Sequence, residues 1–154
     1  MARDILICNH WQTAVRSRLR LLEGRWSAAL EDAAAVLTTT GMPLAALWPH
    51  LISALVPLRR GGSAGDHLDA AWELAQRLDE PLRRLPVLSA LAERMWLTGT
   101  PDERVTGTAP AEIRRAAGSP ATVWVVGELA VWLWRLGLAV PLEPAAMASR
   151  TGSP

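Results

Sequence analysis

The chain has 154 residues, enough for one domain of ordinary size, and half of them are hydrophobic. Ala and Leu dominate this set while Phe and Tyr are missing, and the composition favours an all-α protein because Ala and Leu are strong helix formers. The net charge of +1 excludes a strong field that would steer the chain to nucleic acid or to an anionic membrane.

The N-terminal stretch MARDILICNHWQ has an apolar run of only four residues, which is too short for the core of a signal peptide. Cys8 is the single cysteine, so no internal disulfide can form, and a reducing compartment is expected. We therefore expect a cytoplasmic protein. All sixteen basic residues are Arg, and the Arg-rich pieces RSRLR (16–20) and PLRRL (81–85) are interpreted as solvated helix faces.

Glycine and proline divide the chain at nearly equal intervals of about 38 residues. The two recurring sets are Gly24, Gly61, Gly99 and Gly137, and Pro43, Pro81 and Pro120. This spacing predicts repeated units, each made of a helix, a Gly turn and a second helix. The predicted repeat domain covers 4–140, with units at 4–42, 43–80, 81–119 and 120–140, and 141–154 is expected to be a disordered tail.

Apolar residues recur within these units at steps of three and four, which marks one face of a helix. The expected core residues are Trp26, Ala29, Leu30, Ala33 and Leu37, then Leu47, Leu51, Ala54, Leu55 and Leu58, then Leu68, Ala71, Trp72, Ala75 and Leu78, and finally Leu85, Leu88, Leu91, Ala92, Met95 and Trp96. Asp66 is a plausible N-cap for the helix that follows Gly61.

Several residues conflict with this helical pattern. Because Pro loses a hydrogen bond inside a helix, Pro49 and Pro86 indicate either a helix start close to them or a kink, and Pro57 predicts a bend or break. The segment VTGTAP (105–110) is expected to interrupt the second helix of the third unit and to leave APAEIRRAAG (109–118) as a short remnant.

The segment LLEGRWSAALEDAAAVL (21–37) resembles the tetratricopeptide repeat family, because Gly24, Trp26 and Ala29 match the family's order. More narrowly, GMPLAALWPHLISAL (41–55), LAERMWLTGTPDER and GELAVWLWRLG resemble the repeat region of large actinobacterial LuxR-type or adenylate-cyclase-like ATP-dependent transcriptional regulators. The resemblance implies a right-handed α-solenoid of antiparallel hairpins with about three and a half repeats. In those regulators a P-loop ATPase precedes the repeats and a DNA-binding helix-turn-helix often follows.

The family's register implies a concave groove lined by the first helix of each hairpin. It places six residues toward that groove, namely Arg18, Ser89, Glu93, Trp96, Trp134 and Arg135. Such a groove would suit an acidic or apolar peptide segment. The alternative is that Trp96 and Trp134 stack between neighbouring repeats. Arg16 and Arg20 depart from the family pattern, since they occupy positions where apolar residues are usual.

The stretch VWVVGELAVWLWRLG (123–137) is nearly long enough to span a membrane. Glu128 and Arg135 would each add about 2.5–3.5 kcal/mol to the cost of insertion, and the stretch falls in phase with the repeat, so a packed repeat helix is favoured. It is apolar on nearly every side. Trp124, Trp132 and Trp134 therefore include expected exposed apolar surface, which marks an interaction site or an aggregation liability.

Few residues form patterns that carry chemistry. The chain lacks Lys, which excludes a GxxxxGK[ST] phosphate loop, its Cys and His residues have no zinc spacing, and its positive charge is not clustered as in a DNA-binding helix. The stretch DHLDAAWE (66–73) is interpreted as a helix N-terminus with His67 facing solvent, rather than as an acid–base or metal group. Cys8 and His10 form a second, weaker candidate pair for nucleophile and base.

The sequence therefore favours a non-enzymatic helical-repeat interaction or regulatory module, with no cofactor and no metal, in the manner of a piece of a larger ATP-dependent regulator. The expected partner is a protein or peptide, or a second copy bound through the Trp-rich last helix; no direct nucleic-acid or membrane binding is expected. Two alternatives stay open, a structural fragment without independent binding activity and a small enzyme that uses His67 or His10.

Overall fold

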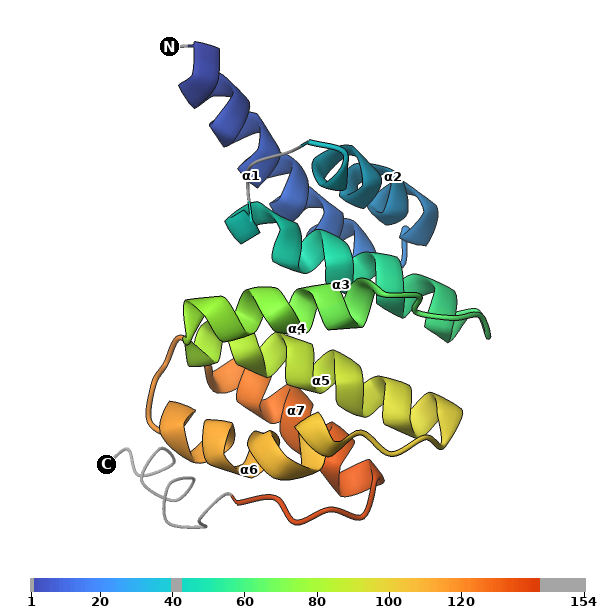
Figure 1. Cartoon of the computed structure of the whole chain (residues 1–154), viewed down its shortest axis with the longest axis vertical. Coiled ribbons are helices and arrows are strands. Elements are labelled where there is room, and N and C mark those ends of the chain that lie inside the picture. The colour runs from blue at the N-terminus through green and yellow to red at the C-terminus, as the bar shows by residue number, and fades with distance from the viewer. Residues whose placement is uncertain (1, 40–42, 142–154) are drawn as a thin grey trace, which may run out of the picture. The chain divides into compact units, whose positions relative to one another are not determined.

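The computed structural model describes residues 2–39 and 43–141, with side chains from residue 8 onward (Figure 1). The described residues form helices and no strand, which confirms the all-α class. The helices are α1 (Ala2–Leu22), α2 (Trp26–Leu37), α3 (Pro43–Arg59), α4 (His67–Leu78), α5 (Pro81–Thr98), α6 (Glu103–Ala116) and α7 (Val123–Arg135). The chain divides into two compact units, residues 1–78 and 79–154.

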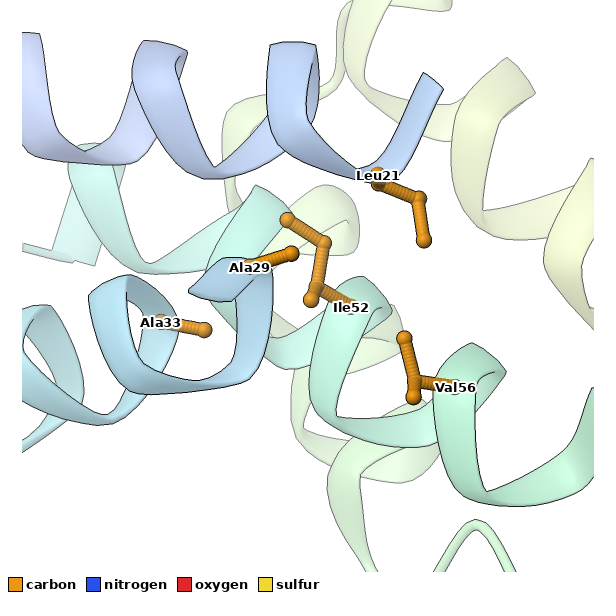
Figure 2. Packing of buried hydrophobic residues seen from close by; sticks show 5 residues of the cluster. All are labelled: Leu21, Ala29, Ala33, Ile52 and Val56. Atoms are coloured by element: carbon orange, nitrogen blue, oxygen red, sulfur yellow. The ribbon is translucent and has the colours of Figure 1, made fainter. Parts of the chain in front are cut away.

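The first unit packs α3 against α1, α2 and α4, and α1 against α2. One core cluster joins three helices, with Leu21 from α1, Ala29 and Ala33 from α2, and Ile52 and Val56 from α3 (Figure 2). Ala29 and Ala33 lie one turn apart and are fully buried, so their small side chains allow the helices to approach closely. The predicted apolar stripe of α2 therefore faces the core.

The second unit packs α5 against α6 and α7, with a smaller contact between α6 and α7. Nearly every side chain of α5 from Leu85 to Met95 is buried. The largest buried side chains of the other two helices are Ile113 of α6 and Leu129 and Leu133 of α7. Burial of the predicted stripes in α3 and α5 is thus confirmed, with the exception of Trp96, which is about half exposed.

The regularly spaced glycines end helices. Gly99 follows α5 with φ 68° and ψ 8°, and its amide donates to the carbonyl of Met95 at 2.8 Å. Gly24, Gly61 and Gly137 follow α1, α3 and α7 with similar positive φ angles. Because glycine adopts this left-handed conformation without the penalty of a Cβ atom, these positions are effective helix ends.

The helices continue through the prolines that the sequence analysis singled out. Pro49 and Pro57 lie inside α3, and Pro86 lies inside α5, so these helices begin earlier, at Pro43 and Pro81. The expected break at Pro57 is wrong, since α3 continues to Arg59. Burial of Pro49 and Pro86 within the apolar face offsets the lost backbone hydrogen bond.

The expected interruption at 105–110 is also wrong, because α6 is continuous from Glu103 to Ala116. Its start is capped by Asp102, whose carboxylate accepts the amide of Arg104 at 3.0 Å. Within the helix Val105, Ala109 and Ile113 recur at steps of four and are completely buried. This packing overrides the weak helix propensity of Gly and Pro in the segment.

No helix within residues 2–39 and 43–141 combines the length and the apolar character that a transmembrane span requires. The predicted tail lies outside the described residues except for its first position, Pro141.

Candidate functional site

Two tryptophans and one arginine meet where α5 and α7 pack together. The ring centroids of Trp96 and Trp132 are 5.8 Å apart at a tilt of 51°. The guanidinium of Arg135 lies 5.5 Å from the centroid of Trp96 and 4.8 Å from that of Trp132. These distances are typical of aromatic pairing and cation–π attraction. The ring partner of Trp96 is therefore Trp132.

The outer face of α7, defined by Trp124, Gly127, Val131 and Trp134, is apolar and exposed. These residues follow each other at steps of three and four, and the exposed fractions of the three side chains are 86 %, 49 % and 74 %. A Cβ atom added to Gly127 would meet no atom within 4 Å, so this part of the face is open. The expectation of exposed tryptophan on the last helix is met by Trp124 and Trp134, whereas Trp132 is half-buried.

The opposite face of α7 belongs to the core. Val125, Leu129 and Leu133 recur at steps of four and are buried in the second unit. The helix is thus apolar on two sides, and the packing of α5 and α6 covers one of them. An exposed apolar strip of this kind marks a site of interaction or an aggregation liability. Glu128 and Arg135 lie along one border of the outer face.

Two predicted groove residues are inaccessible. Ser89 and Glu93 lie one turn apart on α5, and only 2 % and 3 % of their surfaces are exposed. Their placement toward an open groove is therefore wrong, because the apolar residues on both sides of them in α5 are buried as well. The placement implied by the family resemblance was wrong because α5 is buried on nearly every side. The sequence pattern had indicated only one buried apolar face for this helix.

Arg18 belongs to the first unit, away from the residues of α5 and α7 in the chain. Its guanidinium lies 4.0 Å from the ring centroid of Trp48 on α3. The cation–π contact joins α1 to α3 and leaves the Arg18 side chain partly buried. The role of Arg18 in this unit is packing.

The Arg-rich pieces are ion-paired rather than merely solvated, which corrects their interpretation. Arg16 and Arg20 both bind Asp32 of α2, which is buried. In the second unit Arg84 donates to the buried Glu112 at 2.9 Å. These ion pairs were not predicted, although the sequence contains a signal for them. An acidic residue within an apolar stripe, such as Asp32 beside Ala29 and Ala33, requires a basic partner when it is buried.

The hydrogen bonds of the acidic groups set their ionisation. The two hydrogen bonds from Arg16 hold the pKa of Asp32 below its usual range against the opposing effect of burial, with the charge of Arg20 adding to the shift. Burial acts to raise the pKa of Asp102, and the hydrogen bonds from Arg104 together with the charge of Arg94 outweigh it and lower that pKa. Both carboxylates are therefore stable anions that link helices.

The histidines take part in contacts that the sequence analysis missed. His67 is half-buried and its Nδ1 lies 3.0 Å from Nδ1 of His50, so the solvent-facing interpretation is wrong. Among the described residues no three His, Cys, Asp or Glu side chains gather as metal ligands would, so Asp66 and Asp69 do not complete a site with His67. Nε2 of His10 lies 2.9 Å from the hydroxyl of Thr39, beside a small pocket between α1 and α2.

Comparison with known proteins found no matching family model, no matching curated protein and no matching solved structure.

Proposed function

We propose that the chain is a non-enzymatic helical-repeat module that binds a protein partner through the outer face of α7. The observation that carries this proposal is that α7 has two apolar faces, one buried in the core and one exposed. Leu129 and Leu133 are buried in the core, while Trp124 and Trp134 expose most of their surface on the other side. Burying two exposed indoles in an interface removes a large apolar area from water, which drives association.

The proposed occupant is an amphipathic helix of the partner protein. The outer face runs along α7 for about three turns because its residues follow helical spacing, so a helix of the partner can lie along it. Trp124 and Trp134 lie at its two ends and act as anchors, as tryptophan commonly does at interfaces. Gly127 lies between them and leaves room for a close approach. Arg135 provides a charge at the border that suits an acidic residue of the partner.

The wider architecture is part of the same proposal. Helical hairpins whose first helices end in left-handed glycines at regular intervals support a right-handed tetratricopeptide-like solenoid. Together with the resemblance described above, they support membership of a larger ATP-dependent transcriptional regulator that acts in the cytoplasm. An ATPase encoded beside this chain or in continuity with it would favour this part of the proposal, and its absence would count against it.

Site-specific photo-crosslinking tests the interface. Val131→p-benzoylphenylalanine places a crosslinker on the outer face, and Ala111→p-benzoylphenylalanine places one on an exposed position of α6 as the matched control. We expect a defined partner at position 131, lost when Trp124→Gln and Trp134→Gln are added, and no such partner at position 111. Equal labelling at both positions would contradict the proposal and favour a structural role without binding activity.

The solution mass of the full chain separates the two kinds of occupant. Light scattering on the eluted protein is expected to show a monomer, because the proposed occupant is another protein. A dimer that the tryptophan substitutions convert to a monomer would assign the outer face to a second copy instead. A dimer that these substitutions leave intact would place the contact elsewhere and contradict the proposed surface.

A further inference from the structure

Two histidine rings face each other between α3 and α4 of the first unit. His50 lies within α3 and His67 is the first residue of α4. Their Nδ1 atoms are 3.0 Å apart, and their ring centroids are 5.3 Å apart at a tilt of 47°. The centroid separation exceeds the nitrogen separation by the distance from each ring centre to its own Nδ1, added over the two rings. Each nitrogen therefore points almost directly at the other. This is the geometry of an N–H···N hydrogen bond rather than of two nitrogens converging on an ion beside them.

The hydrogen bond requires that the two rings share one proton at this contact. A neutral imidazole has one N–H donor and one nitrogen acceptor, whereas an imidazolium ion has two donors and no acceptor. One Nδ1 must therefore carry a proton while the other presents a lone pair. When both rings are charged, two donors and two positive charges face each other at the same distance, and the contact becomes repulsive.

We propose that His50 and His67 form an acid-sensitive latch, which holds the first turn of α4 against α3 at neutral pH and releases it when both rings are protonated. Both histidines belong to the first unit, whereas α7 belongs to the second. Its action is local, because α4 packs on α3 within this unit and begins at His67.

The pKa of His50 is shifted by its burial and by His67, and no carboxylate of the described residues is among the causes. Among the side chains that the structure describes, the other ionisable groups on the elements around the pair are Cys8, His10, Arg16, Arg18 and Arg20 of α1, Glu31 and Asp32 of α2, Arg59 and Arg60 at the end of α3, and Asp66, Asp69, Glu73 and Arg77 of the following loop and α4. None of them is among the causes that shift the pKa of His50. Burial lowers that pKa first, and the charge of His67 lowers it further.

The lowered pKa of His50 determines how the stability of the folded chain changes with pH. Because the pKa of His50 is lower in the folded chain, the unfolded chain binds more protons than the folded chain near and below the ordinary histidine value of about 6.5. The stability contributed by the latch is complete above that value and is lost as the pH falls through the lowered folded value. Carboxylate pairs lose their contribution only at more acidic pH, so the two effects are separable.

Histidine side-chain NMR of the full chain between pH 8 and pH 5 tests the latch. The pair is expected to take up its two protons in separate steps, and the titration midpoint of His50 is expected to rise by about one pH unit in His67→Gln. His10→Gln is the matched control and should change neither step, because His10 contacts Thr39 instead. A His50 midpoint that is the same with and without His67 would overturn the proposal.

Hydrogen exchange reports the release of α4 itself. The amide of Ala70 donates to the carbonyl of Asp66 at 3.0 Å in the first turn of α4. Its protection factor is expected to fall between pH 7.5 and pH 5 in the wild-type chain by about tenfold, the change that corresponds to one pH unit of coupling. His67→Gln should retain little of this pH dependence. His50→Gln provides a second variant should the first fail to fold, and an undiminished pH dependence in the variant that folds would overturn the latch.

Discussion

Arg16 binds Asp32 through two parallel hydrogen bonds, from Nε to Oδ2 at 2.9 Å and from Nη2 to Oδ1 at 2.8 Å. Arg20, one turn further along α1, adds a third bond to Oδ2 at 2.7 Å. The carboxylate is almost completely buried between α1 and α2. Such bidentate pairs fix the relative position of two groups as well as contributing energy, so Asp32 sets how these two helices cross.

Asp32→Ala is expected to lower the free energy of unfolding by about 1.5–3 kcal/mol at pH 7, because it removes charge-assisted hydrogen bonds and leaves Arg20 without this partner. Urea unfolding followed by circular dichroism measures the change. Glu31→Ala is the control, since Glu31 is exposed on the same helix and should cost little. Equal effects of the two substitutions would contradict the structural role of Asp32.

The same pair predicts a dependence on pH. Hydrogen bonds from Arg16 lower the pKa of Asp32 in the folded chain, so the unfolded chain takes up this proton first as the solution is acidified. The contribution is complete above about pH 4 and is lost as the pH falls through the lowered value. The difference in stability between the wild-type chain and Asp32→Ala should therefore shrink below pH 4. A difference that stays constant down to pH 2 would be inconsistent with a lowered pKa.

Gly99→Ala and Gly107→Ala are expected to act in opposite directions. Gly99 has φ 68° at the end of α5, so alanine there should destabilise the chain by about 1 kcal/mol. Gly107 lies inside α6, where an added Cβ meets no atom within 4 Å, and alanine should stabilise by about 0.5–1 kcal/mol through helix propensity. Thermal unfolding of the two variants checks both signs, and a loss of stability in Gly107→Ala would argue against a continuous α6.

Two buried serines provide a matched test of hydrogen bonding. The hydroxyl of Ser17 donates to the carbonyl of Ala14 at 2.7 Å, whereas the hydroxyl of Ser89 is buried without a hydrogen-bond partner in the part of the chain that the structure describes. Ser89→Ala should stabilise the chain by about 1 kcal/mol because it removes an unsatisfied polar group. Ser17→Ala should bring no such gain. If denaturant unfolding shows that Ser89→Ala is as harmful as Ser17→Ala, the Ser89 hydroxyl has a partner.

The two faces of α7 should differ sharply in their contribution to stability. Leu129→Ala is expected to cost about 2–5 kcal/mol because Leu129 is completely buried. Trp134→Gln should change the free energy of unfolding by less than about 0.5 kcal/mol because this side chain is largely exposed, although it should weaken partner crosslinking. Unfolding curves for both variants test this contrast. A large cost for Trp134→Gln would show that the outer face is part of the fold.

Features that depend on neighbours along the chain were predictable. The ends of α1, α3, α5 and α7 follow from the spaced glycines, since left-handed backbone is a local property of residues such as Gly99. The burial of stripes such as Leu47, Leu51 and Leu58 follows from helical periodicity. Local rules failed at Pro57 and at 105–110, because packing supplies enough energy to keep a weak helical segment helical.

The sequence by itself determined that the described residues are helical, that α1, α3, α5 and α7 end at the spaced glycines and that α7 carries exposed tryptophan. Only the tertiary structure decided which groups meet, such as Trp96 with Trp132 and His50 with His67. The physical reason is that helix ends and apolar stripes depend on residues within one or two turns. Ring contacts and ion pairs depend on how helices cross, which is a property of packed side chains from distant parts of the chain.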